Sequence, residues 1–136
     1  MGEHDENISF ERSVELVGEN VAQALRALSL KIFVEASAIA EQRGVILADT
    51  KFEFGEDENG VLTLADEVLT SDSSRYWDGE LYAAGGPDRL SSFDKQIVRN
   101  WLLENWDQAG EPPVLAQHIV DETAARYREL IERLTA

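Results

Sequence analysis

The sequence ILADTKFEF, which begins at Ile46, alternates charged and uncharged side chains in a way that could carry chemistry. It falls in a predicted β-strand over residues 45–54, and side chains point alternately to the two faces of a strand. Asp49, Lys51 and Glu53 are therefore expected on one face. Two carboxylates there suit Mg²⁺, which prefers oxygen ligands, while the lysine could hold the acids apart and contact an anionic substrate. The alternative is a salt bridge on a solvated face, which would contribute little to stability.

A second predicted strand, residues 61–70, follows the turn-forming sequence GEDENG, and the two strands are expected to form a β-hairpin. If the turn is centred in this sequence, Lys51 lies opposite Asp66, and Glu53 is a diagonal neighbour. A slip of one residue would place Glu67 opposite the lysine instead. In either register an acid from the second strand joins the polar face of the first.

Two further polar segments could bind an anion. The sequence SDSSR, residues 71–75, offers hydroxyls, backbone N–H groups and a guanidinium that could clamp a phosphate. The sequence SFDKQIVR, residues 92–99, places Asp94, Lys95 and Arg99 near a predicted helix N-terminus, where anions bind readily. Taken alone, the first segment is better interpreted as an ordinary turn and the second as an exposed helical turn.

A fourth polar cluster lies near the start of the chain, where His4, Asp5 and Glu6 are adjacent. A histidine beside an aspartate could bind a metal or exchange protons, and a solvated terminus is the alternative. The other histidine of the chain, His118, falls on the last predicted helix. The sequence has neither a glycine-rich phosphate loop nor the serine elbow of the α/β-hydrolases.

The composition restricts the class of protein. The chain has 136 residues, 43% of them hydrophobic, and a formal net charge of −15, which argues against a nucleic-acid partner. It has no cysteine, so disulfides and thiolate metal sites are excluded. No apolar run is long enough to cross a membrane, and the acidic start does not fit a secretory signal peptide. A cytoplasmic location without membrane contact is expected.

The elements that position these residues predict an α+β fold in one domain, residues 1–136. The predicted helices are residues 9–17, 20–43, 93–106 and 116–134, with Ser9, Asn20 and either Ser91 or Ser92 as N-caps and Gly44 as a C-terminal glycine. Residues 71–92 are expected to form a loop, and a loop of that length is uncommon unless it has a function. The hairpin is expected to carry the polar site, packed among the helices.

In four segments taken in order, the chain resembles the C-terminal part of the phosphoribosylaminoimidazole-succinocarboxamide synthase (SAICAR synthetase) family: GEHDENISF, GVILADTKFEFG, LADEVLTSDSSRYW and SFDKQIVRNWL. The tail PPVLAQHIVDETAARYRELIERLT is similar to the closing helix of that family. The resemblance implies an ATP-dependent ligase of purine biosynthesis. Such an enzyme joins carboxyaminoimidazole ribotide (CAIR) to L-aspartate, forming SAICAR, ADP and phosphate, with Mg²⁺ as cofactor.

The resemblance also implies roles for individual residues. Catalytic roles fall to Lys51, on the reacting carboxylate and phosphoryl oxygens, and to Asp49. Magnesium ligation falls to Glu53 and Asp66, with Glu67 beside them. The implied ribotide-binding residues are Asp72, Ser73, Ser74 and Arg75, with Asp94 and Lys95 closing the pocket and Asp5 facing the substrate.

Two departures from the family pattern are visible. Ser71 stands where the family usually has proline, which frees a backbone torsion and an N–H group in the loop. The family also has an N-terminal lobe, about as large again, that covers ATP and that this chain lacks. We therefore expect a separate N-terminal lobe or self-association. The alternative function is a non-catalytic remnant or binding module that needs such a lobe.

Overall fold

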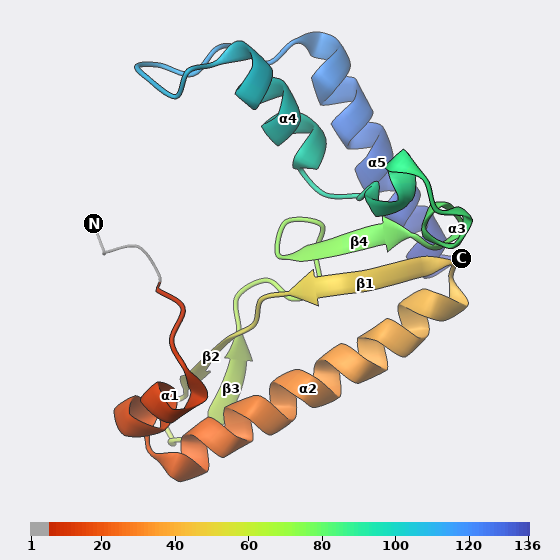
Figure 1. Cartoon of the computed structure of the whole chain (residues 1–136). Helices are drawn as coiled ribbons and strands as arrows, with labels where there is room; N and C mark the ends of the chain where they lie inside the picture. The colour runs from red at the N-terminus through yellow and green to blue at the C-terminus, as the bar shows by residue number, and fades with distance from the viewer. Residues whose placement is uncertain (1–5) are drawn as a thin grey trace. The chain divides into compact units, whose positions relative to one another are not determined.

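In the computed structural model, which describes residues 6–136, two helices open the chain (Figure 1). Helix α1 (Phe10–Val17) begins after Ser9, whose hydroxyl oxygen accepts a hydrogen bond from the Arg12 N–H at 3.1 Å. It ends at Gly18, whose φ of +84° is a conformation that glycine adopts without strain. The predicted cap and the predicted stop are both confirmed.

Helix α2 (Glu19–Gln42) follows directly. The N-cap predicted at Asn20 is wrong, because the carbonyl of Gly18 already accepts the Ala22 N–H at 3.0 Å and places Asn20 inside the first turn. The far end agrees with the prediction, since Gly44 follows the helix with φ +69°. Of the helices in the described part of the chain, none has the length and apolar character needed to cross a membrane.

The chain divides into two units, one ending at Val34 and the other running from Glu35 to Ala136, so that α2 contributes to both. In the first unit the guanidinium of Arg26 lies over the ring of Phe10, 5.1 Å from its centroid. The second unit holds all the strands and the remaining helices. The expectation of a single domain over residues 1–136 stays a prediction.

The strand pairing differs from the predicted hairpin. Strand β1 (Val45–Thr50) pairs antiparallel with β4 (Ser74–Asp78), and β2 (Glu53–Glu56) pairs antiparallel with β3 (Leu62–Ala65). The predicted first strand is thus two strands with different partners. Burial favours the outer pairing, because it brings the buried Val45 and Leu47 of β1 beside the buried Tyr76 of β4, which is the ladder partner of Leu47.

The predicted turn between β2 and β3 is confirmed, and the register is the one slipped by a single residue that the sequence left open. The carboxylate of Asp57 accepts the N–H groups of Asn59 and Val61 at 2.9 and 2.8 Å and closes the turn. Glu53 pairs with Ala65 and the ladder ends there, so Lys51 is the ladder partner of neither Asp66 nor Glu67. The second strand does not reach residue 70, because Asp66 adopts a left-handed φ of +61° and leaves the extended conformation.

The loop predicted for residues 71–92 is wrong, since this region contains β4, helix α3 (Gly79–Ala84) and the 3₁₀ helix η1 (Pro87–Leu90). Asp78 caps α3 by accepting the N–H groups of Glu80 and Leu81 at 2.9 and 3.0 Å. Only glycine fits at position 79, because a Cβ there would lie 2.7 Å from the carbonyl oxygen of Gly44.

Two helices complete the second unit, α4 (Gln96–Asn105) and α5 (Gln117–Thr135). The position of α5 agrees closely with the prediction. Helix α4 begins later than predicted, because Phe93 is tied to β4 by its N–H, which donates to the carbonyl of Tyr76 at 2.9 Å. The first-turn N–H of Gln96 then bonds to Asp94, so neither Ser91 nor Ser92 is the N-cap.

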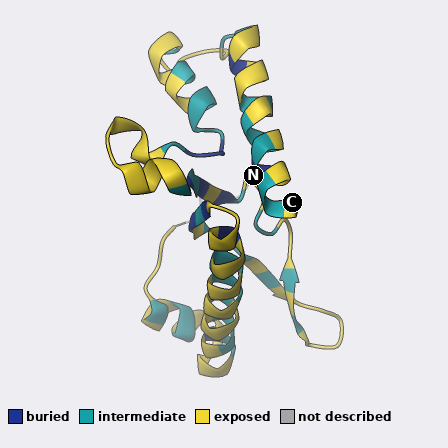
Figure 2. Ribbon diagram, turned by 90° about the vertical axis from the view of Figure 1, so that its right-hand side faces the viewer, coloured by how far each residue is buried: buried dark blue, intermediate teal, exposed yellow. Residues whose placement is uncertain are grey.

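The core of the second unit lies where β1, β4 and the start of the α4 segment meet, and Figure 2 shows buried residues gathered there. Its most deeply buried large side chains are Phe93 and Val45. Two arginines of α5, Arg126 and Arg133, each place their guanidinium 5.2 Å from the centroid of the Phe93 ring. The antiparallel strands and the flanking helices confirm the predicted α+β class.

Candidate functional site

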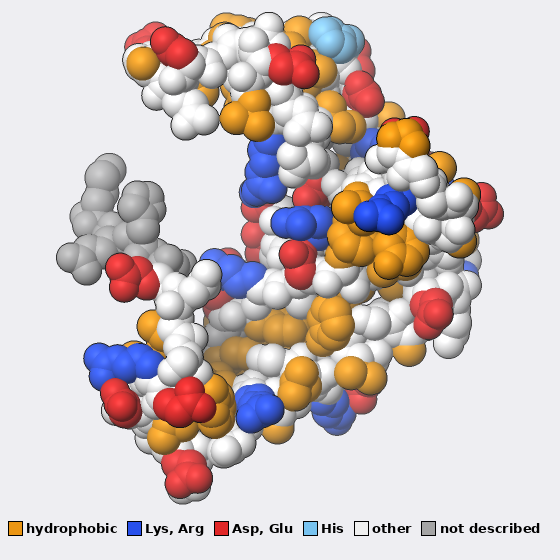
Figure 3. Space-filling model, viewed as in Figure 1, with side chains coloured by type: hydrophobic (Ala, Val, Ile, Leu, Met, Phe, Trp, Pro, Cys, Tyr) orange, Lys and Arg blue, Asp and Glu red, His pale blue; other side chains and the backbone are white. Residues whose placement is uncertain are grey.

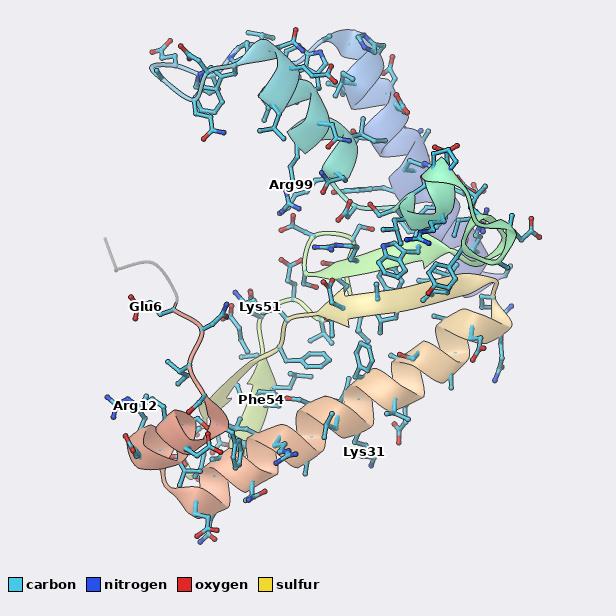
Figure 4. All side chains as sticks on the ribbon, in the orientation of Figure 1. Glu6, Arg12, Lys31, Lys51, Phe54 and Arg99 are labelled. Carbon is cyan, nitrogen blue, oxygen red and sulfur yellow. The ribbon has the colours of Figure 1, made fainter. Side chains whose placement is uncertain are left out.

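A cavity of about 310 Å³ lies in the second unit, at the junction of the two small sheets and the start of α4. Every residue that lines it was expected at the site from the sequence: Lys51, Glu53, Asp66, Glu67, Asp72, Ser73 and Lys95. The lysine at the β1–β2 junction is labelled in Figure 4. The residues converge although Lys51 lies outside the β2–β3 ladder, because both chain segments leave their strands at the cavity.

Each lysine of the cavity is paired with one of its acids. The ammonium of Lys51 lies 2.6 Å from the Glu53 carboxylate, and the ammonium of Lys95 donates to the carboxylate of Asp72. The hydrogen bond from Lys95, together with its charge, lowers the pKa of Asp72 below its ordinary value. All four side chains are well exposed, so these pairs contribute little to stability and can exchange partners readily.

The donor set of the cavity suits a hard cation shared with a ligand. Its four carboxylates outnumber its two ammonium groups, which leaves an excess of two negative charges. Among residues 6–136, no group of three or more histidine, aspartate or glutamate side chains is arranged to hold a metal ion by itself. Mg²⁺ in proteins commonly takes one or two carboxylates and completes its shell with water and phosphate oxygens. The residues present therefore fit Mg²⁺ bound jointly with a phosphorylated ligand.

A second cluster of expected residues lies beside the cavity, centred on Arg75. In the β1–β4 ladder Arg75 is the partner of Asp49, and its guanidinium lies 3.6 Å from that carboxylate. On the other side it lies 3.8 Å from the carboxylate of Asp94. The Asp94 side chain is buried and accepts the hydroxyl of Ser92 at 2.5 Å, so it holds a fixed position. Arg75 is thus oriented by acids on two sides.

One expected residue stands apart from both clusters. Ser74 is buried, and its hydroxyl lies 2.8 Å from that of Thr50, which links the ends of β4 and β1. Asp5 lies outside the described residues. Figure 3 shows basic and acidic side chains interspersed on the surface around the start of α4. The ligand contacts expected of all these residues stay predictions.

Sequence reasoning left two polar residues near the cavity out of the predicted site. Thr70 was predicted as the end of a strand, but its hydroxyl is hydrogen-bonded to the Glu67 carboxylate and to the backbone N–H groups of Asp72 and Ser73. A threonine three residues after Glu67 and three before Ser73 is a spacing at which such local bonds form, and that spacing was visible. Arg99 was noticed but not included in the predicted site, and it points from α4 toward the loop before β4 (Figure 4).

Comparisons with known proteins agree on one family. The family model described as SAICAR synthetase matches residues 1–113. A protein of Leifsonia xyli subsp. xyli, named phosphoribosylaminoimidazole-succinocarboxamide synthase, is 61% identical over 99% of this chain. One of the same name from Corynebacterium diphtheriae is 54% identical over 99% of this chain. This chain covers only 46% of each protein, so it spans about half the length of the curated relatives it matches.

The structural comparison agrees with the sequence comparison. A solved structure titled SAICAR-synthase from Saccharomyces cerevisiae complexed SAICAR has a TM-score of 0.81 and 43% sequence identity. The match covers 96% of this chain and 44% of that one. A second structure, titled SAICAR synthetase (Type-2) in complex with ADP, has a TM-score of 0.68 at 26% identity. Both comparisons therefore relate this chain to part of a longer protein.

Proposed function

Because the chain belongs to the SAICAR synthetase family, we propose that it forms the C-terminal, ribotide- and Mg²⁺-binding part of an ATP-dependent ligase. The ligase would join CAIR to L-aspartate and produce SAICAR, ADP and phosphate. The observation that carries the proposal is the cavity in which seven residues expected from the family motifs converge. Its lysines and carboxylates provide the two kinds of charge that an anionic ribotide and its cation need.

The paired charges of the cavity explain how a substrate would enter. In the absence of ligand, the ammonium groups of Lys51 and Lys95 form ion pairs with the carboxylates of Glu53 and Asp72, respectively. An incoming carboxylate or phosphate would replace these acids, because exposed ion pairs exchange at little cost. Lys51 would then contact the reacting carboxylate. The released Glu53, together with Asp66 and Glu67, would hold Mg²⁺, which supplies charge neutralisation for the crowded phosphate oxygens.

The second cluster would bind the ribotide. Arg75 is held between Asp49 and Asp94 and keeps donors available, since a guanidinium carries five N–H groups. We assign to it the ribotide phosphate, with Asp72 and Ser73 at the neighbouring edge of the cavity. In this proposal Asp49 acts by orienting Arg75. Ser74 would support the loop from its bond with Thr50, and Asp5 would face the substrate.

The first experiment measures whether the 136-residue chain binds the ribotide. SAICAR with Mg²⁺ is expected to raise the unfolding temperature, because a ligand at 100 times its Kd stabilises the native state by about 2.7 kcal/mol. Arg75→Gln should abolish this shift. The matched control is Arg89→Gln, an exposed arginine of η1 that lies outside the cavity. An unfolding temperature that does not respond to SAICAR and Mg²⁺ would refute the proposed site.

A second experiment separates binding from catalysis. ADP release is measured with CAIR, L-aspartate and Mg-ATP supplied to the chain alone. Release that depends on all three would mean that this chain builds a complete active site. Ribotide binding without release, with release restored by the N-terminal half of a relative, would mean that the chain acts as a binding part of the enzyme.

A further inference from the structure

The loop from Asp66 to Ser73 forms one wall of the cavity, and its two ends carry different parts of the proposed site. Glu67 lies on the side assigned to the cation, and Asp72 and Ser73 lie on the side assigned to the ribotide. The loop has an irregular path, because both Asp66 and Leu69 adopt left-handed φ angles of +61° and +60°. Aspartate adopts this conformation more readily than most residues, whereas a leucine does so rarely and is held there by surrounding contacts.

One hydroxyl group connects the two ends of the loop. The Thr70 hydroxyl donates to the Glu67 carboxylate, and its oxygen accepts the N–H groups of Asp72 and Ser73 at 3.2 and 3.1 Å. The Thr70 N–H donates in turn to the Ser73 hydroxyl oxygen at 3.1 Å. A single side chain therefore fixes a carboxylate on one side of the cavity relative to the backbone on the other.

The path of the loop does not depend on this hydroxyl alone. The Ser74 N–H donates to the carbonyl of Thr70 at 2.9 Å, which anchors the loop to the start of β4. The hydroxyl of Tyr76, a residue only 3% exposed, donates to the carbonyl of Leu69 at 2.7 Å. Removal of the Thr70 hydroxyl should therefore leave the backbone path in place while releasing Glu67 and the two amides.

We propose that Thr70 is a positioning residue that couples the cation side of the cavity to its ribotide side. The inference rests on the proposed function, since it concerns the ligands named there. If the hydroxyl holds the Glu67 carboxylate in a fixed position relative to the Asp72–Ser73 backbone, Mg²⁺ bound at Glu67 should preorganise that backbone for the ribotide. Ribotide affinity should then depend on Mg²⁺ more strongly with the hydroxyl than without it.

The test compares Thr70→Val, which removes the hydroxyl, with Thr70→Ser, which keeps it. The control is Thr63→Val, the same substitution at an exposed residue of β3 whose hydroxyl donates only to the Val61 carbonyl at 3.0 Å. Amide exchange at Asp72 and Ser73 is measured by NMR without ligand. The Kd of SAICAR is measured by calorimetry with and without Mg²⁺, and the ratio of the two values reports the coupling.

In Thr70→Val we expect amide exchange at Asp72 and Ser73 to accelerate about 3- to 10-fold, the range expected for loss of one hydrogen bond. The ratio of Kd values should fall by a similar factor, and Thr70→Ser should restore both. Unchanged amide exchange in Thr70→Val would overturn the inference whether or not SAICAR binds. Accelerated exchange with an unchanged Kd ratio would overturn it too, because a structural role alone weakens binding equally with and without Mg²⁺. No SAICAR binding by the wild-type chain would instead refute the proposed function, and the positioning role with it.

Discussion

Replacement of Asp78 by alanine should destabilise the second unit by about 2 to 3 kcal/mol. The carboxylate of this residue has two separate tasks. One oxygen caps α3 by accepting two backbone N–H groups, and the other lies 2.8 Å from the guanidinium of Arg133 on α5. Asp78 thereby connects the end of β4, the start of α3 and the last helix. Alanine removes both connections at once.

The magnitude follows from the two tasks taken separately. Loss of an N-cap side chain costs about 1 kcal/mol. Loss of a fully buried ion-pair partner costs about 3 to 5 kcal/mol, but the Arg133 side chain is 30% exposed and retains Glu129 at 2.6 Å. We therefore reduce the second contribution to about 1 to 2 kcal/mol. Asp78→Asn, which keeps an oxygen for the cap, should show only this second part.

Unfolding in urea, followed by tryptophan fluorescence, measures this change. All three tryptophans, Trp77, Trp101 and Trp106, belong to the second unit, so the signal reports that unit. The matched control is Asp88→Ala, an exposed acid of η1, which should shift the midpoint little. A loss in Asp78→Ala no larger than that of the control at pH 7 would refute the magnitude.

The same variant has a predicted pH dependence. Burial acts to raise the pKa of Asp78, but the N–H of Leu81 and the charge of Arg133 outweigh it and leave the pKa lowered. A carboxyl with a lowered folded pKa stabilises the fold above its unfolded pKa, about 3.9, and loses this contribution as the pH falls through the folded value. The difference between wild type and Asp78→Ala should therefore shrink below about pH 4. A difference that stays constant between pH 7 and pH 3 would contradict the assignment of charge to this site.

Three further perturbations test the core, a close backbone contact and the cavity. Phe93→Ala should lower the free energy of unfolding by about 3 to 5 kcal/mol in urea titrations, because the residue is only 1% exposed. A smaller loss would mean that neighbouring side chains move into the space left by the ring. Gly79→Ala should lower the free energy of unfolding by about 1 to 3 kcal/mol, because the new Cβ would lie 2.7 Å from the carbonyl oxygen of Gly44. Gly55→Ala should be near neutral, because a Cβ at that position meets open space. Lys95→Met should raise the pKa of Asp72 toward its ordinary value in an NMR titration of side-chain carboxyls, and an unchanged pKa would mean that Lys95 is not the cause of the shift.

Helices α1, α2 and α5 were predictable because their signals are local. Ser9 at the start of α1, Gly18 at its end and Gly44 after α2 each act within one turn of their own position. The apolar spacing of α5 is likewise local. No local signal identifies the partner of a strand, so the strand nearest in sequence was predicted as the partner.

The pairing of β1 with β4 could not be read from the sequence for a physical reason. Strand β4 has only five residues, begins with a serine and ends with an aspartate that is also the N-cap of α3. Its sequence therefore resembles that of a polar loop. Its buried position depends on β1 and on Phe93, which lie far away in sequence. The cavity residues were nevertheless predictable by motif, because they lie in the chain segments that leave the ends of the strands at the cavity.

The order of the strands has a consequence for how the chain folds. Strands β2 and β3 are nested between β1 and β4, so the inner hairpin closes a short loop and the outer ladder a long one. Loop-closure entropy favours early formation of the inner pair, which then shortens the effective loop for the outer pair. Lys51 and Asp72 lie at the junction of the two pairs, so the cavity assembles only when the outer ladder closes. If the chain binds the ribotide as proposed, the bound ligand should slow unfolding and leave the rate of refolding almost unchanged.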